Sequence, residues 1–213
     1  MTTIATITAA AGLLLAGTLA ATAGENTWGP GADDAAFQAM LKAGFREKGI
    51  AKLSRLDQDA TQAFCSDPVK ANSKESVKAR AEIEAANQAT IKWPADGKFL
   101  GDFKEGEKIA QSGRGLTSTD KADQPNGGNC YNCHQISKAE ISYGTIGPSL
   151  LGYGKLRGNS EEVLRYTWGK IFNAKASNAC SNMPRGGHMG IITEQQIKDL
   201  MALLLDPASP VNQ

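Results

Sequence analysis

The sequence is short of the residues from which catalytic sites are most often built. It contains only 2 histidines and 4 cysteines among 213 residues, and 6% of its residues are aromatic. No Ser/His/Asp arrangement and no pair of acids in an evident pocket is recognisable. The low aromatic content also makes a large β-sandwich core improbable. These shortages give no indication of acid–base or nucleophilic catalysis.

An excess of either charge is also missing. The 23 basic residues are balanced by 22 acidic residues, for a formal net charge of +1 at pH 7, which gives no indication of nucleic-acid or acidic-membrane binding. Repeats and strand-like alternation are absent as well. The 41% of hydrophobic residues are enough for a packed core, and the length permits one domain with an extension or two small domains.

No long apolar run follows residue 23. Residues 4–23 are uncharged and end in Ala21-Thr22-Ala23, which resembles a secretory signal cut after Ala23. Because no Lys or Arg precedes this run, a retained membrane anchor is the alternative. The run is rich in Ala, Thr and Gly, so we expect cleavage of residues 1–23 and an exported, periplasmic protein that is not held in a membrane.

Helical patterns account for most of the remaining chain, and the expected fold class is all-α. The first block, residues 24–96, is predicted to be a helical extension with a stripe from Phe37 to Phe45, a second helix ending near Asp67-Pro68 and a third capped by Asn72. Later helices are predicted to begin at Asp102, Asn159 and Thr193. The last of these carries Ile197, Leu200, Met201 and Leu204 on one face and ends at Asp206-Pro207.

Long irregular stretches separate the later helices, such as the polar loop over residues 112–129. Loops of this length are unusual in a compact domain unless something else supplies the core. The motif CYNCH, residues 130–134, indicates that a bound haem supplies this part of the core. C-x-x-C-H is typical of covalent attachment of one c-type haem, with Cys130 and Cys133 as thioether donors and His134 as the proximal iron ligand.

Two other interpretations of the cysteine pair are weaker. Zinc needs four ligands, and Cys65 and Cys180 form no second pair in the sequence. A redox dithiol normally sits on a βαβ framework, which this sequence does not show.

The segment Gly147-Pro148-Ser149-Leu150 resembles the proximal-side loop of class I cytochromes c. That resemblance implies that Pro148 packs against the porphyrin and that its carbonyl accepts a hydrogen bond from the free ring nitrogen of His134, which fixes the ring.

The sixth iron ligand has three candidates in NACSNMPRGGHMG, residues 178–190: Met183, His188 and Met189. Met183 is favoured because Pro184 keeps it extended and because it precedes the terminal amphipathic helix, as in class I cytochromes c. His188 would give bis-histidine iron or lie at the surface, and Met189 follows the flexible pair Gly186-Gly187.

Longer segments extend the resemblance. The runs GNCYNCHQ, GTIGPSLLGYGKLRG and YTWGKIFNAKASNACSNMPRGGHMGIITEQQIKDLMALLLDPASPVN closely resemble the SoxX family, over most of residues 127–212, with a weaker match at residues 55–68. These are the small monohaem cytochrome c subunits of bacterial thiosulfate-oxidising SoxAX complexes. The resemblance implies a class I cytochrome c domain over residues 97–207, behind the extension.

The resemblance also implies partners and a role. The chain would pair as a heterodimer with SoxA, a cytochrome subunit that carries the catalytic cysteine of an L-cysteine S-thiosulfotransferase acting on a carrier protein. It would pass electrons to a soluble cytochrome. The alternative is a free-standing periplasmic electron carrier, or a haem subunit of another oxidoreductase. A zinc-binding module is a third possibility.

Two cysteines and a set of basic residues remain. Cys65 and Cys180 both lie in family-like segments, and an even pair left over in an exported protein suggests a disulfide. A free thiol or a bond to another chain is the alternative.

The loops of the haem domain carry basic residues that form either a solvated face or a docking surface for an acidic partner: Lys155, Arg157, Lys170, Lys175 and Arg185.

Overall fold

The computed structural model describes residues 35–213. The expected signal sequence and cleavage site therefore lie outside the described residues. The chain forms two compact units, Met1–Met40 and Leu41–Gln213, and the boundary falls inside helix α1, Ala35–Gly44. The helix predicted around Phe37 is thus present, and the rest of the description concerns the second unit.

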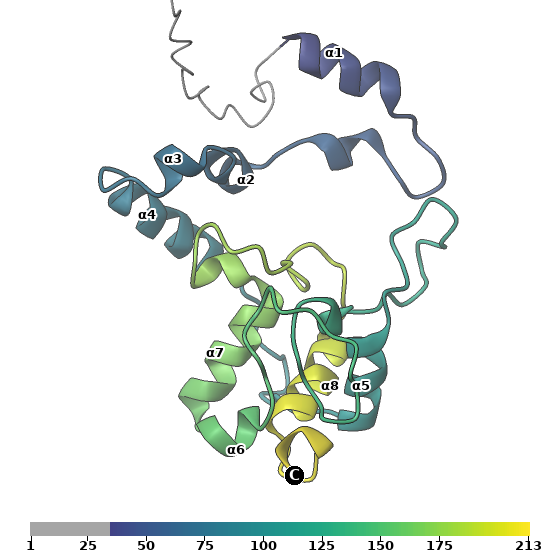
Figure 1. The fold of residues 1–213 in the computed structure, drawn as a ribbon, viewed down its shortest axis with the longest axis vertical. Coiled ribbons are helices and arrows are strands. Elements are labelled where there is room, and N and C mark those ends of the chain that lie inside the picture. Colours follow the sequence, from purple (N-terminus) through teal and green to yellow (C-terminus); the bar gives the residue numbers. More distant parts are fainter. Residues whose placement is uncertain (1–34) are drawn as a thin grey trace, which may run out of the picture. The chain divides into compact units, whose positions relative to one another are not determined.

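Helices are the only regular structure between residues 35 and 213, which confirms the all-α prediction for this range. Apart from them, Lys48 and Ala51 form an isolated bridge. No helix here is long and apolar enough to span a membrane. The elements that follow α1 (Figure 1) are η1 Leu53–Leu56, α2 Ala60–Cys65, α3 Pro68–Ala71, α4 Val77–Gln88, α5 Phe103–Gln111, η2 Cys130–Asn132, α6 Tyr153–Arg157, α7 Glu161–Phe172, η3 Ala174–Ala176, α8 Glu194–Leu205 and η4 Pro210–Asn212.

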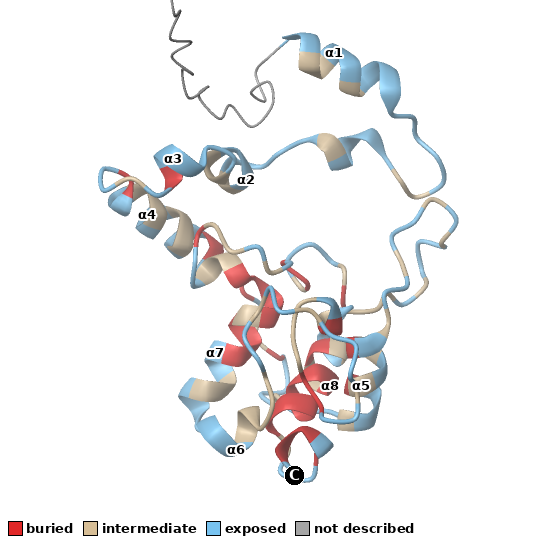
Figure 2. Ribbon diagram, in the orientation of Figure 1, coloured by how far each residue is buried: buried red, intermediate tan, exposed pale blue. Residues whose placement is uncertain are grey.

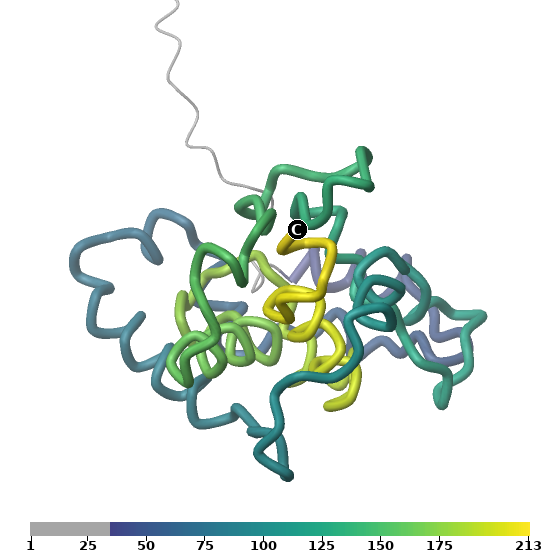
Figure 3. Tube along the Cα trace, turned by 90° about the horizontal axis from the view of Figure 1, so that it is seen from below, coloured from purple at the N-terminus to yellow at the C-terminus, as the bar shows by residue number. Residues whose placement is uncertain are grey.

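The core is built around α8. This helix packs between α5 and α7 (Figure 3), and the face predicted from its sequence is buried: Ile197, Leu200, Met201 and Leu204. A Cβ on Gly106 would overlap the α8 backbone, so this glycine lets α5 approach closely. Buried residues concentrate in α8 and the adjoining end of α7, whereas α1 to α3 are mostly exposed (Figure 2).

Two of the four predicted helix caps are confirmed and two are wrong. Asp102 caps α5, and Thr193 caps α8 in a full capping box with Gln196. Asn72, in contrast, ends α3, where its side chain donates to the Pro68 carbonyl at 2.8 Å. Ser160 replaces Asn159 as the cap of α7, and two glutamates in the first turn favour that helix start electrostatically.

The helical extension contacts the rest of the chain at the C-terminal end of α4. The buried Asn173 amide, at the end of α7, donates to Asn87 Oδ1 and Thr90 Oγ1, each at 3.0 Å. The indole N–H of Trp168 donates to the Lys92 carbonyl at 2.9 Å. These bonds join the C-terminal end of α4 to α7.

Candidate functional site

The C-x-x-C-H motif forms a single tight turn. Asn129, in the left-handed conformation at φ 51°, leads into η2, and the Cys130 carbonyl accepts hydrogen bonds from the backbone N–H groups of Cys133 and His134 at 3.1 and 3.0 Å. Cys130 and Cys133 carry free thiols. Burial raises the pKa of the Cys130 thiol to about 12, so this thiol is neutral at physiological pH.

Tyr131, the residue that follows Cys130, anchors this turn to α5. Its hydroxyl is hydrogen-bonded to Glu107 Oε1 at 2.8 Å and to Ser137 Oγ at 3.0 Å. Burial, together with the Glu107 carboxylate, raises the pKa of Tyr131 to about 12. The motif is therefore held by a buried polar network that the sequence reasoning did not anticipate.

His134 is oriented by a neighbouring loop. Its Nδ1 lies 2.7 Å from the Pro148 carbonyl oxygen, which is the hydrogen bond that the resemblance implied. Since a carbonyl can only accept, Nδ1 carries the proton and Nε2 is left with a free lone pair. The loop itself is fastened to the motif, because the Gly147 N–H donates to the Cys133 carbonyl at 2.8 Å.

Gly147 explains how closely this loop can lie against the histidine. A Cβ at this position would overlap the His134 imidazole ring. The glycine is therefore needed for the close approach that brings the Pro148 carbonyl to Nδ1.

A cavity of about 630 Å³ lies beside the motif. Its volume is within the range of small-molecule and cofactor sites. All five residues predicted to hold the haem line it: Cys130, Cys133, His134, Pro148 and Met183. Apolar side chains from several elements line it as well, among them Ile136, Leu150, Ile171, Leu200 and Leu203.

These residues fit a covalently held haem. The cavity offers two reduced thiols, an imidazole with an available Nε2, and mainly apolar walls for a flat apolar macrocycle. A closed zinc site finds less support, because residues 35–213 contain no group of three or more His, Cys, Asp and Glu side chains arranged to hold a metal.

Among the three candidate sixth ligands, Met183 alone lines the cavity. It is half-buried against the hydrophobic core, and its backbone N–H donates to Ser181 Oγ at 3.2 Å. His188 and Met189 are exposed. Desolvation and the nearby Arg185 lower the pKa of His188, which keeps its ring neutral at physiological pH.

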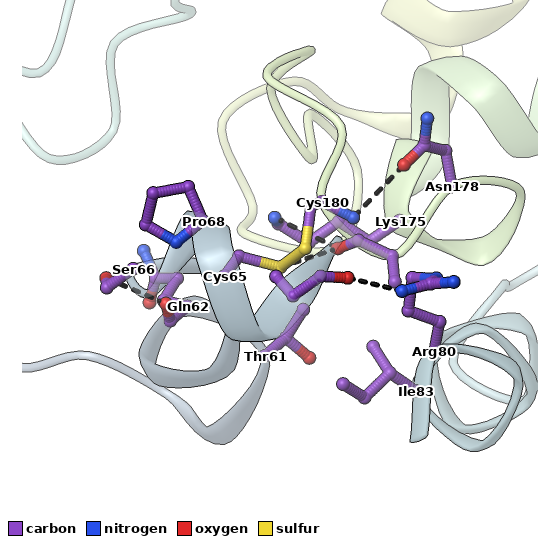
Figure 4. The surroundings of a disulfide bond; sticks show 12 residues. Thr61, Gln62, Cys65, Ser66, Pro68, Arg80, Ile83, Lys175, Asn178 and Cys180 are labelled. Atoms are coloured by element: carbon purple, nitrogen blue, oxygen red, sulfur yellow. Dashed lines mark hydrogen bonds between the residues drawn. A yellow bond between two sulfur atoms is a disulfide. The ribbon is translucent and has the colours of Figure 1, made fainter. Parts of the chain in front are cut away.

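The disulfide predicted from the leftover cysteines is present between Cys65 and Cys180, with 5.4 Å between the Cα atoms. Figure 4 shows it joining the end of α2 to the loop that leads to Met183. Next to it, the Ala179 N–H donates to Glu84 Oε1 on α4 at 3.0 Å. Two helices of the extension thus hold the start of this loop.

The basic residues do not form the single exposed group that the sequence suggested. Arg185 is only 6% exposed and pairs with Asp59 Oδ2 at 2.6 Å, because a buried guanidinium needs a compensating charge. Desolvation lowers the pKa of Lys170 and Lys175, which are half-buried. Arg185 therefore belongs to the packing of the loop, a role that depends on a partner distant in the sequence.

Comparison with known proteins gives one informative relative. No known family profile matches the chain. A protein of Aquifex aeolicus (strain VF5), described as an uncharacterized lipoprotein, is 38% identical over 157 residues, which is 73% of this chain and 73% of that protein. The chain belongs to the same protein family as this Aquifex lipoprotein.

Proposed function

We propose that this protein is a monohaem c-type cytochrome of class I that transfers single electrons. The observation that carries the proposal is the joint lining of one cavity by Cys130, Cys133, His134 and Met183. Cys130 and Cys133 would hold the haem through thioether bonds. His134 Nε2 and the Met183 thioether would bind its iron.

The chain's own residues set the properties of such a site. A haem bound here supplies one-electron redox chemistry. The Pro148 carbonyl holds the proton on His134 Nδ1 and so keeps Nε2 available as a ligand. A methionine ligand in place of a second histidine would raise the reduction potential, and the apolar walls would limit the access of water.

We further propose that the electrons come from thiosulfate oxidation in a SoxAX-type heterodimer. The support is the resemblance of residues 127–212 to the SoxX family. All 4 cysteines have other roles here: two belong to the haem motif and two form the disulfide. The cysteine at which thiosulfate is conjugated to the carrier protein would therefore be on the SoxA partner, and a soluble cytochrome would be the acceptor.

An exported location fits this proposal. The relative is described as a lipoprotein, a class of protein that cells export, and disulfides such as Cys65–Cys180 persist outside the cytoplasm.

The test of the haem assignment is the spectrum of the purified oxidised protein. A c-type haemochrome spectrum and a near-red sulfur-to-iron charge-transfer band are expected. Met183→Ala should abolish the near-red band and lower the reduction potential, whereas His188→Ala and Met189→Ala, as matched controls, should retain both. A colourless protein would instead indicate a zinc module, and retention of the band in Met183→Ala would refute the ligand assignment.

The test of the subunit assignment is co-purification. The native protein should be isolated together with a second cytochrome that contains a reactive cysteine. Isolation as a lone red monomer would favour the free-standing carrier.

A further inference from the structure

The loop that carries Met183 is bound on both sides by one short helix of the extension. Cys180, three residues before Met183, is bonded to Cys65, the last residue of α2. Arg185, two residues after Met183, pairs with Asp59, the residue that caps the start of α2. The two ends of α2 are therefore bound to the loop on either side of Met183, one before it and one after it.

Asp59 contributes one carboxylate oxygen to each of two tasks. Oδ1 accepts the Gln62 backbone N–H at 2.8 Å and so caps α2, while Oδ2 pairs with the Arg185 guanidinium at 2.6 Å. The position of α2 and the position of the loop are thereby joined through a single side chain.

Arg185 transmits this restraint to the backbone next to Met183. Its side chain is 6% exposed, so it has little freedom to move while it remains paired. Its carbonyl also accepts the Met189 backbone N–H at 2.9 Å. If the pairing with Asp59 were lost, the buried guanidinium would be left uncompensated and would be drawn toward water, and the backbone two residues from Met183 would follow.

We infer that Asp59 and Arg185 are positioning residues for the sixth haem ligand, and that α2 acts as a clamp that keeps Met183 in the cavity. The inference rests on the proposed function. A thioether is an uncharged ligand without a hydrogen-bond donor, so how well it competes for iron depends on how firmly its loop is held. A looser loop makes the sixth position accessible to added ligands.

The experiment is imidazole binding to the oxidised haem protein, followed by absorbance. Imidazole must displace Met183, so its dissociation constant reports how firmly the methionine is held. Asp59→Asn removes the charge but keeps a good helix cap, because Asn and Asp cap helices about equally. We expect imidazole to bind about tenfold more tightly to this variant, equivalent to about 1.4 kcal/mol.

Asp96→Asn is the matched control. Asp96 is also a half-exposed carboxylate paired with a cation, Lys198 at 2.9 Å, but it contacts neither α2 nor the Met183 loop. Asp59→Asn should lose more thermal stability than Asp96→Asn, because Arg185 is buried whereas Lys198 keeps a second partner, Glu194. Only Asp59→Asn should change the imidazole affinity. The clamp would be overturned if Asp59→Asn bound imidazole with the same affinity as the parent. It would also be overturned if the two variants changed the imidazole affinity equally.

Different experimental results would contradict the clamp and the proposed function. If the parent protein contains no haem, or if its oxidised form lacks the near-red band, the proposed function is wrong and the clamp falls with it. If the band is present and disappears in Met183→Ala, while Asp59→Asn binds imidazole like the parent, the clamp alone is wrong.

Discussion

At the scale of single residues, the site depends on a glycine as much as on its chemically active side chains. Gly147 has no side chain to displace the His134 ring, and this allows the Pro148 carbonyl to reach Nδ1 at 2.7 Å. The bond selects the tautomer that can bind iron. Gly147 therefore determines whether His134 is held in the tautomer that leaves Nε2 unprotonated.

Gly147→Ala should reduce haem incorporation severely. The added Cβ overlaps the imidazole, so the ring must rotate or the loop must move away, and either change breaks the hydrogen bond to Pro148. The measurement is the ratio of haem absorbance to protein after purification. Gly44→Ala is the control, since nothing lies within 4 Å of a Cβ there; an equal ratio for both variants would contradict this account.

The residues that line the cavity were predictable where a motif constrains them. Cys130, Cys133 and His134 were expected together from their spacing, and Met183 was expected with them from its proline and from the helix behind it; all four line the cavity. Arg185 and Tyr131 were not predictable, because their roles depend on partners far away in the sequence, Asp59 and Glu107. Local pattern carries no information about such pairings.

At the scale of elements, helix starts were predictable only where no competing cap was nearby. Thr193 and Gln196 form the capping box that their spacing predicts. Asn72 and Glu75 have the same spacing, but Asp67 caps an earlier turn that begins with Pro68. Asn72 then falls at the end of that turn, and α4 cannot begin until Val77.

Among the helices, α2 is expected to have the largest effect on stability for its length, because it carries one end of the disulfide. A Cys65→Ser, Cys180→Ser double variant should lower the free energy of unfolding by about 5 kcal/mol, because the bond closes a loop of more than 100 residues in the unfolded chain. The sequence separation of the two cysteines is 115.

Guanidinium unfolding of the purified protein measures this change. The parent protein treated with a thiol reductant is the control and should unfold like the double variant. A difference from the untreated parent of less than about 1 kcal/mol would mean that the unfolded-chain argument does not apply here.

At the scale of the whole molecule, the extension and the domain that contains the cavity share one buried joint. Asn173 is completely buried and bonds to Asn87 and Thr90 at the end of α4. Trp168 adds its bond to Lys92, and the Arg165 guanidinium lies over the Trp93 ring, 4.8 Å from its centroid. The all-α class was evident from the sequence, whereas this joint was not, because isolated asparagines give no periodic signal.

Because of this joint, Leu41–Gln213 should unfold in a single transition. Asn173→Ala leaves the Asn87 Oδ1 without its donor and should cost about 1–3 kcal/mol, while Asn159→Ala, at an exposed position, should change stability by less than about 0.5 kcal/mol. Urea unfolding followed by haem absorbance and by tryptophan fluorescence would test this. Two separate midpoints in the parent protein would show that the joint does not couple the two parts.

The pairing of Cys65 with Cys180 also bears on how the protein matures. For the proposed function, one pair of cysteines must be oxidised while Cys130 and Cys133 stay reduced in the same compartment. Four cysteines allow three pairings, and the nearest neighbours in sequence, Cys130 and Cys133, close the smallest loop and meet most often in the unfolded chain. Haem attachment therefore competes in time with a wrong disulfide, and the yield of red protein should depend on which reaction reaches the motif first.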